Sequence, residues 1–87
     1  MSDWHWEYDP DPRHVIGETP NLAFVALVEE RADELVRAAA ALYLDGAAYQ
    51  GPSPGLGEEV LPNGMFQYLT VVRQRCLYVV QVTLWPL

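Results

Sequence analysis

The chain begins with a short stretch in which aromatic and polar residues follow one another with a period of two. Over residues 4–8 they alternate, so the three aromatic residues of this segment share one face of a predicted short strand. The sequence Asp-Pro-Asp-Pro over residues 9–12 ends the strand, because proline lacks the amide hydrogen that a strand ladder needs. Residues 13–18 are predicted to form a linker with room for one helical turn.

A long amphipathic helix is predicted over residues 20–45. Its apolar residues recur at steps of three and four, which makes one stripe: Val25, Val28, Ala32, Leu35, Val36, Ala39, Leu42 and Tyr43. Thr19 and Pro20 form a helix-start signal, and Gly46 is a stop signal. The charged residues of the helix lie off the stripe, and we expect them to face water: Glu29, Glu30, Asp33, Glu34 and Arg37.

The C-terminal part of the chain predicts strands. Residues 50–59 are rich in glycine and proline and are interpreted as a loop, followed by a stub of strand at 60–61. An Asn-Gly turn then precedes two strands, 65–73 and 76–85, which are expected to form a hairpin. Alternation places Leu77, Val79, Gln81, Thr83 and Trp85 on one face of the last strand. Both strands are apolar on both faces, so one face is expected to pack on the helix and the other to meet more protein.

Together these elements predict an α+β fold. We expect a single domain over residues 1–87, with one long helix packed on a small antiparallel sheet in the order β-α-β-β-β. A chain of 87 residues is close to the lower limit for one hydrophobic core. Its hydrophobic content of 51% and aromatic content of 11% are sufficient to form that core, which excludes an acidic disordered tail.

The net charge of −7 bears on the class of partner. Residues 1–45 carry the whole excess of acids, and residues 46–87 are neutral. A chain with few cations is poorly suited to nucleic acids and to anionic membranes. No apolar run approaches the ~20 residues that a bilayer-spanning helix needs, and no secretory signal is recognised. We therefore expect a cytoplasmic protein with a protein partner, which the acidic helix face would attract if that partner is basic.

The spacing of residues along the chain indicates few candidate catalytic or metal-binding groups. Cys76 is the single cysteine, so no internal disulfide forms, and we expect a buried thiol in a strand. His5 and His14 have no companion at a metal-ligand spacing, so neither a metal site nor a cofactor is expected. Arg73 and Arg75 flank the hairpin tip, where they either hold a phosphate or carboxylate or keep the tip soluble.

Several of these patterns resemble the RelE/ParE superfamily of bacterial toxin–antitoxin systems. They are the order of elements, the aromatic pattern from Trp4 to Tyr8, the Gly/Pro loop over 51–57, the aromatic-x-Tyr-x-x-Val strand over 66–71 and the last strand over 77–82. The resemblance implies a small toxin that either cleaves mRNA on the ribosome or poisons gyrase, with a cognate antitoxin as partner.

The nuclease branch uses arginine or lysine from the sheet, with histidine and tyrosine near the C-terminus, to bind and act on a phosphate. Here Gln67 stands where the penultimate strand would carry an arginine, and the sequence given ends soon after the last strand. The chain is also acidic, whereas the toxins are usually basic. The candidate catalytic residues that remain are Arg73, Arg75, Tyr68 and His14.

We therefore expect a degenerate RelE/ParE-like protein that acts mainly through protein contacts, with weak or absent mRNA cleavage, and leave open whether it is an enzyme. An alternative is a non-enzymatic acidic binding protein, either an immunity protein or an antitoxin-like inhibitor of a basic partner. A third alternative is a structural oligomer such as a homodimer, since the strands are apolar on both faces and the chain ends in Trp85, Pro86 and Leu87.

Overall fold

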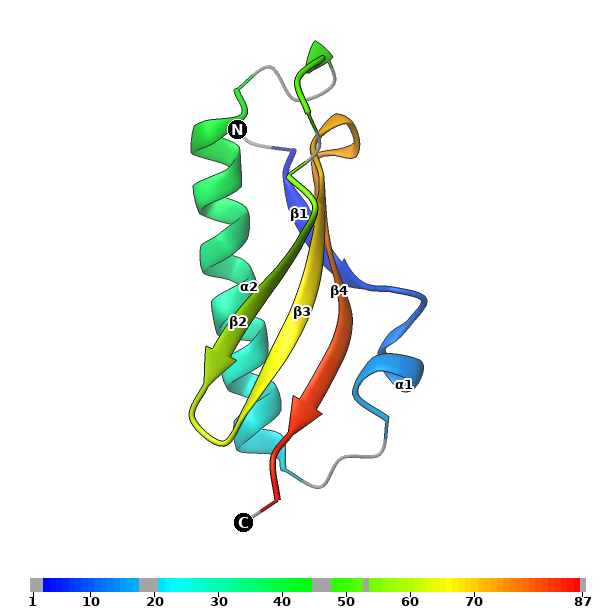
Figure 1. The fold of residues 1–87 in the computed structure, drawn as a ribbon, viewed down its shortest axis with the longest axis vertical. Coiled ribbons are helices and arrows are strands. Elements are labelled where there is room, and N and C mark those ends of the chain that lie inside the picture. Colours follow the sequence, from blue (N-terminus) through cyan, green and yellow to red (C-terminus); the bar gives the residue numbers. More distant parts are fainter. Residues whose placement is uncertain (1–2, 18–20, 45–47, 53, 87) are drawn as a thin grey trace.

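The computed structural model describes residues 3–17, 21–44, 48–52 and 54–86. In chain order, its elements are β1 (His5–Tyr8), α1 (Pro12–Val15), α2 (Leu22–Leu42), β2 (Leu56–Leu61), β3 (Gly64–Val71), the 3-10 turn η2 (Val72–Gln74) and β4 (Cys76–Leu84). The four strands form one sheet with α2 along one of its faces, so the predicted α+β class is confirmed (Figure 1). None of the helices in these ranges combines the length and apolarity needed to cross a bilayer.

The sheet is mixed, whereas the sequence predicted an antiparallel one. Its strand order is β1-β4-β3-β2, and β1 pairs with β4 in parallel while the other neighbours are antiparallel. The reason is the path of the chain. After β1, α2 returns the chain to the starting end, and the three strands that follow run down, up and down in Figure 1. The last strand therefore has the direction of β1, and its free edge is where β1 pairs.

A β-bulge changes which residues of β4 face the helix. Gln67 pairs with Gln81 but Tyr68 pairs with Val79, so β4 contains one extra residue at this point. Beyond the bulge the alternation is reversed. Val82 packs against the core cluster while Gln81 is exposed, so the predicted place of Gln81 on the same face as Val79 is wrong.

Helix α2 begins at an asparagine cap. The Asn21 side chain accepts a hydrogen bond of 2.9 Å from the backbone N–H of Phe24, which satisfies one of the free donors of the first turn. The helix buries every third or fourth residue: Phe24, Val28, Ala32, Val36 and Ala39. Phe24 was not in the predicted stripe, and Leu42, which was, is 72% exposed. The predicted start and stop residues, Thr19, Pro20 and Gly46, lie outside the described residues.

Two acidic residues of α2 that the sequence predicted to face water also bind the first strand; Asp33 is exposed as predicted, and Glu29 is half-buried. The Tyr8 hydroxyl donates to Glu29 Oε2 at 2.9 Å, and the Trp6 indole N–H donates to Asp33 Oδ1 at 2.7 Å. The aromatic side chains of β1 do share one face, as predicted, and that face meets α2. These two hydrogen bonds fix the short edge strand to the helix.

Strand β2 is longer than the predicted stub, because residues 56–59 of the expected loop are paired with β3. Gly57 makes the pairing possible. A Cβ atom at Gly57 would lie 2.3 Å from Cζ of Tyr68, so the Tyr68 ring occupies the place of the missing side chain. The glycine that indicated a loop is therefore a strand residue.

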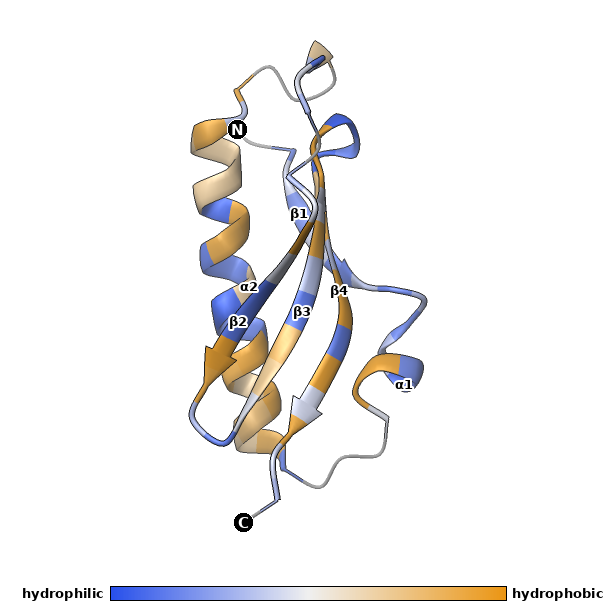
Figure 2. Ribbon diagram, in the orientation of Figure 1, coloured by the Kyte–Doolittle hydropathy of each residue, from blue (hydrophilic) through white to orange (hydrophobic). Residues whose placement is uncertain are grey.

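The face of the sheet away from α2 is named here the open face. In Figure 1, α2 lies behind the sheet and α1 lies beside β4. Hydrophobic and hydrophilic residues alternate along β3 and β4, as Figure 2 shows, and the half-buried residues of β3 on the open face are Met65, Gln67, Leu69 and Val71. The register places Val60 opposite Met65 and Leu56 opposite Leu69, and these two β2 side chains are 63% and 59% exposed.

Candidate functional site

Three segments meet at one end of the sheet, which is named here the turn end. They are the start of β1, the η2 turn with the start of β4, and residues 48–52 (Figure 1). The backbone N–H of His5 donates to the carbonyl oxygen of Arg75 at 3.1 Å, which fixes the start of β1 against the turn. Residues from opposite ends of the sequence are therefore neighbours here.

Arg73 is exposed on η2 and lines a shallow cleft. Its Nε donates to the carbonyl oxygen of Tyr49 at 2.9 Å. The cleft beside it has a volume of about 230 Å³ and is lined by Tyr49, Gly51, Val71, Val72 and Arg73. The Arg73 guanidinium is thus partly used to hold residues 48–52 against the turn.

Arg75 lies in the left-handed backbone region, with φ of 52°. One of its terminal nitrogens lies 2.7 Å from Oδ2 of Asp3, and the pair is partly exposed, so solvent weakens its contribution to stability. The two arginines share one turn, but each binds a different segment. The negative charge of Asp3, from the acidic half of the sequence, therefore lies directly against a cation of the neutral half.

Tyr68 lies on the helix side of the sheet, away from the arginines. It lines a shallow cleft of about 220 Å³ between the C-terminal half of α2 and strands β2 and β3. Burial raises the pKa of the Tyr68 hydroxyl, and the nearby charge of Glu59 adds to the effect. A tyrosine that holds its proton more tightly is a weaker acid and is less often ionised at neutral pH, so it is less available to accept a proton.

His14 lies on α1, far along the molecule from the turn end (Figure 1). Its ring Nδ1 is 2.8 Å from Oδ2 of Asp11, and its backbone N–H donates to Oδ1 of the same residue. The backbone hydrogen bond, followed by the ring contact, lowers the pKa of Asp11. The structure therefore does not bring the four predicted catalytic residues together: Arg73 and Arg75 share the turn end, and Tyr68 and His14 lie elsewhere.

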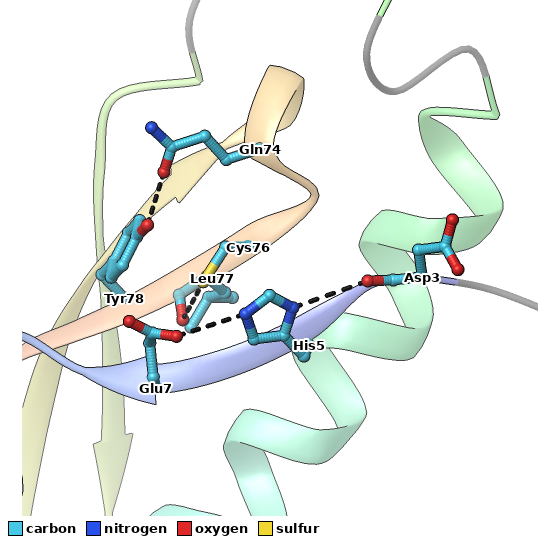
Figure 3. Close-up of polar contacts among 7 residues, drawn as sticks. All are labelled: Asp3, His5, Glu7, Gln74, Cys76, Leu77 and Tyr78. Carbon is cyan, nitrogen blue, oxygen red and sulfur yellow. Dashed lines mark hydrogen bonds and ion pairs between the residues drawn. The ribbon is translucent and has the colours of Figure 1, made fainter.

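The β1–β4 pairing brings together a cluster that the sequence did not reveal (Figure 3). His5 Nε2 is 3.2 Å from Oε2 of Glu7, and His5 Nδ1 is 3.5 Å from the carbonyl oxygen of Asp3. The thiol of Cys76 lies within 4.8 Å of donor atoms of both His5 and Glu7. The signal that identifies the cluster is strand register, which spacing along the chain does not contain.

Cys76 is the buried member of this cluster. It is 1% exposed, and its thiol donates a long hydrogen bond of 3.8 Å to the carbonyl oxygen of Leu77. Burial raises the pKa of the thiol, and the charge of Glu7 acts in the same direction. Beside it, the Tyr78 hydroxyl donates to Oε1 of Gln74 in the turn (Figure 3).

The candidate residues provide few of the groups that are needed to bind and cleave a phosphodiester. On β3, Gln67 donates to Oε1 of Glu58 at 3.1 Å, so the position at which the resemblance would place an arginine holds an amide bound to a carboxylate. A fixed negative charge next to that position repels a phosphate. The turn end offers two partly engaged guanidinium groups, and its clefts are shallow.

Known proteins do not indicate a function for this chain, so a function has to be inferred from the positions of the residues described above. No protein-family model matches the chain, and neither does any curated protein or solved structure.

Proposed function

We propose that this chain is a RelE/ParE-like, toxin-related bacterial protein that acts in the cytoplasm mainly through protein contacts, with weak or absent cleavage of mRNA. The order of the major elements supports the proposal. Apart from the four-residue α1, the elements follow the β-α-β-β-β order on which the resemblance to this superfamily is based. The comparisons neither add to this resemblance nor oppose it.

The observation that carries the proposal is the open face together with edge strand β2. Leu56 and Val60 on β2 are 59% and 63% exposed and lie opposite Leu69 and Met65 of β3, with the Glu58–Gln67 pair between these two apolar contacts. An edge strand can accept a further strand through its backbone, and exposed apolar side chains beside such an edge are typical of protein interfaces. A cognate antitoxin is the partner that the resemblance implies, and a second copy of this chain is the alternative.

The polar residues favour contact over catalysis. Gln67 is bound to Glu58, Arg75 is paired with Asp3, and Arg73 donates to a backbone carbonyl. Efficient RNA cleavage needs cations and proton-transfer groups converging on one phosphate. The four candidate catalytic residues occupy three separate places, which supports weak or absent cleavage.

The acidic inhibitor alternative receives less support. It depends on a negative surface along α2, but Glu29 and Asp33 bind β1, and Arg31 lies 3.3 Å from Glu34 and 3.6 Å from Glu59. Arg31 therefore offsets part of the negative charge, and the carboxylates of Glu29 and Asp33 are partly occupied by β1. Figure 2 shows the charged residues gathered in the middle of α2, with apolar residues at both ends.

Controlled expression in a bacterial host tests the proposal. We expect expression of the natural chain to arrest growth while the cellular mRNA remains largely intact. The double variant Leu56→Glu with Val60→Glu should relieve the arrest, because two charges on exposed positions of the open face oppose docking without entering the core. Leu22→Glu with Leu42→Glu, two exposed apolar positions on α2 outside the open face, is the matched control and should leave the arrest unchanged.

A second pair of variants separates contact from phosphate chemistry. If the arginines act on a phosphate, Arg73→Gln with Arg75→Gln should relieve the arrest, and Arg37→Gln on α2 should not. Growth without arrest on expression of the natural chain, with no change in translation or DNA topology, would contradict the proposal that the protein is toxin-related. A salt-sensitive complex with a basic protein encoded nearby would then favour the acidic inhibitor.

A further inference from the structure

The cluster of His5, Glu7 and Cys76 contains the donor types that bind zinc. Imidazole nitrogen, carboxylate oxygen and thiolate sulfur are the ligands found in protein zinc sites, whereas calcium and magnesium prefer oxygen alone. The cluster lies on the open face at the turn end, where β1 pairs with β4 (Figure 3). We propose that His5, Glu7 and Cys76 form a zinc-binding site.

The backbone sets the positions of the three ligands. His5 is the register partner of Cys76 on the neighbouring parallel strand, so both side chains leave the sheet on the same face. Glu7 follows two residues after His5 and therefore shares that face. A site built on two paired strands is held more firmly than one built on a loop.

The distances fit with small side-chain movements. Donor atoms bound to one tetrahedral zinc ion lie roughly 3.3 to 3.6 Å apart, given metal–ligand bonds of about 2.0 to 2.3 Å. The His5 Nε2 to Glu7 Oε2 distance is 3.2 Å, and the three donor atoms lie within 4.8 Å of one another. Rotations of the His5 and Glu7 side chains, which are 56% and 55% exposed, can close the remaining gap.

The surroundings also suit an ion. His5 Nδ1 lies 3.5 Å from the carbonyl oxygen of Asp3, and a carbonyl in this place favours the tautomer that leaves Nε2 free to bind metal. The buried Cys76 sulfur forms the floor of the site, and the two exposed side chains form its rim. A thiolate and a carboxylate together balance the charge of a divalent cation, and three protein ligands leave a fourth position for water.

The test is calorimetric titration of zinc ion into the full chain, reduced and freed of metal by a chelator. We expect one ion per chain, and at least about tenfold weaker binding in His5→Gln, because even the loss of an outer-shell partner costs that much. His14→Gln is the matched control, since it removes the other histidine of the chain, and it should bind like the natural protein. Absence of zinc binding, or equal affinity of the His5 and His14 variants, would overturn the site.

A second measurement tests the sulfur ligand. Cobalt bound to a thiolate produces a charge-transfer absorption in the near ultraviolet, which we expect in the natural chain and in His14→Gln but not in Cys76→Ser. Zinc should also raise the thermal unfolding midpoint of the natural chain and leave that of His5→Gln almost unchanged. His5→Gln alters an exposed side chain, so it gives a result even if Cys76→Ser does not fold. A cobalt spectrum without the sulfur band would reject Cys76 as a ligand.

Discussion

At the scale of single residues, tertiary contacts change what the side chains do. Tyr8 is 8% exposed, and its hydroxyl donates to Glu29 on α2. Burial, followed by the hydrogen bond and the charge of Glu29, raises the pKa of Tyr8 well above its ordinary value of 10.0. A residue that alternation marks only as apolar is therefore also a polar link between strand and helix.

The Tyr8 link predicts a pH dependence at the alkaline side. The folded chain holds the Tyr8 proton more tightly than the unfolded chain, so this stabilisation is present below about pH 10 and is lost as the pH rises above it. We expect the free energy of unfolding to fall with rising pH in this range, and to fall less steeply in Tyr8→Phe. At neutral pH the same variant should be less stable by about 1 kcal/mol, since Glu29 loses a donor.

Urea unfolding monitored by circular dichroism at several pH values makes the comparison. Part of the slope should remain in Tyr8→Phe, because burial also raises the pKa of Tyr68. Glu29→Gln should reduce the slope in part, and its exposed neighbour Glu30→Gln serves as the control. Identical slopes for the natural chain and Tyr8→Phe would show that Tyr8 does not carry the effect.

At the scale of elements, the bulge in β4 decides which residues form the core. Strict alternation groups Gln81 with Leu77 and Val79, whereas the shifted register turns Val82 toward the helix. A hairpin of uninterrupted alternation would bury an amide at Gln81. The extra residue avoids that cost while keeping both strands paired.

The shifted register predicts opposite results for two adjacent substitutions. Val82→Gln should lower the free energy of unfolding by about 1 to 2 kcal/mol, because it places an amide against the core cluster. Gln81→Val, at an exposed position of the same strand, should change it by no more than about 0.5 kcal/mol. Denaturant unfolding of both variants measures the difference. A larger loss of unfolding free energy for Gln81→Val than for Val82→Gln would mean that Gln81 faces the core, as strict alternation predicts.

At the scale of the whole molecule, the charge is distributed differently in space than along the sequence. Residues 1–45 hold the acidic excess, but β1 returns Asp3 and Glu7 to the end that carries Arg73 and Arg75. The turn end is therefore mixed in charge, and the neutral half of the sequence does not form a cationic region. This mixing weakens an RNA-binding role for the turn end.

The excess of acids predicts how stability responds to salt. A net charge of −7 on a molecule of 43 × 22 × 20 Å gives self-repulsion that salt screens, so the thermal unfolding midpoint should rise with sodium chloride concentration. Glu30→Gln should show a smaller rise because it starts with less repulsion. A midpoint that falls with salt would mean that ion pairs such as Arg31 with Glu34 outweigh the repulsion.

Much of the fold was predictable because it depends on residues close together in the sequence. The three- and four-residue recurrence of apolar side chains determined α2, alternation determined β1, β3 and β4, and the Asn-Gly turn determined where β3 begins. The same local reasoning placed Arg73 and Arg75 in one turn. It missed most of β2, since glycine there serves a close approach by Tyr68 instead of a loop.

The sequence by itself determined the long helix, most of the strands, their order and the α+β class, because helix period, strand alternation and turn chemistry act over a few residues. Only the tertiary structure decided the parallel pairing of β1 with β4, the bulge, and the meeting of His5 and Glu7 with Cys76. Each of these depends on which distant strand edge is free and in which register it pairs. The candidate zinc site is built from those long-range choices, which is why the spacing of histidine and cysteine along the chain gave no sign of it.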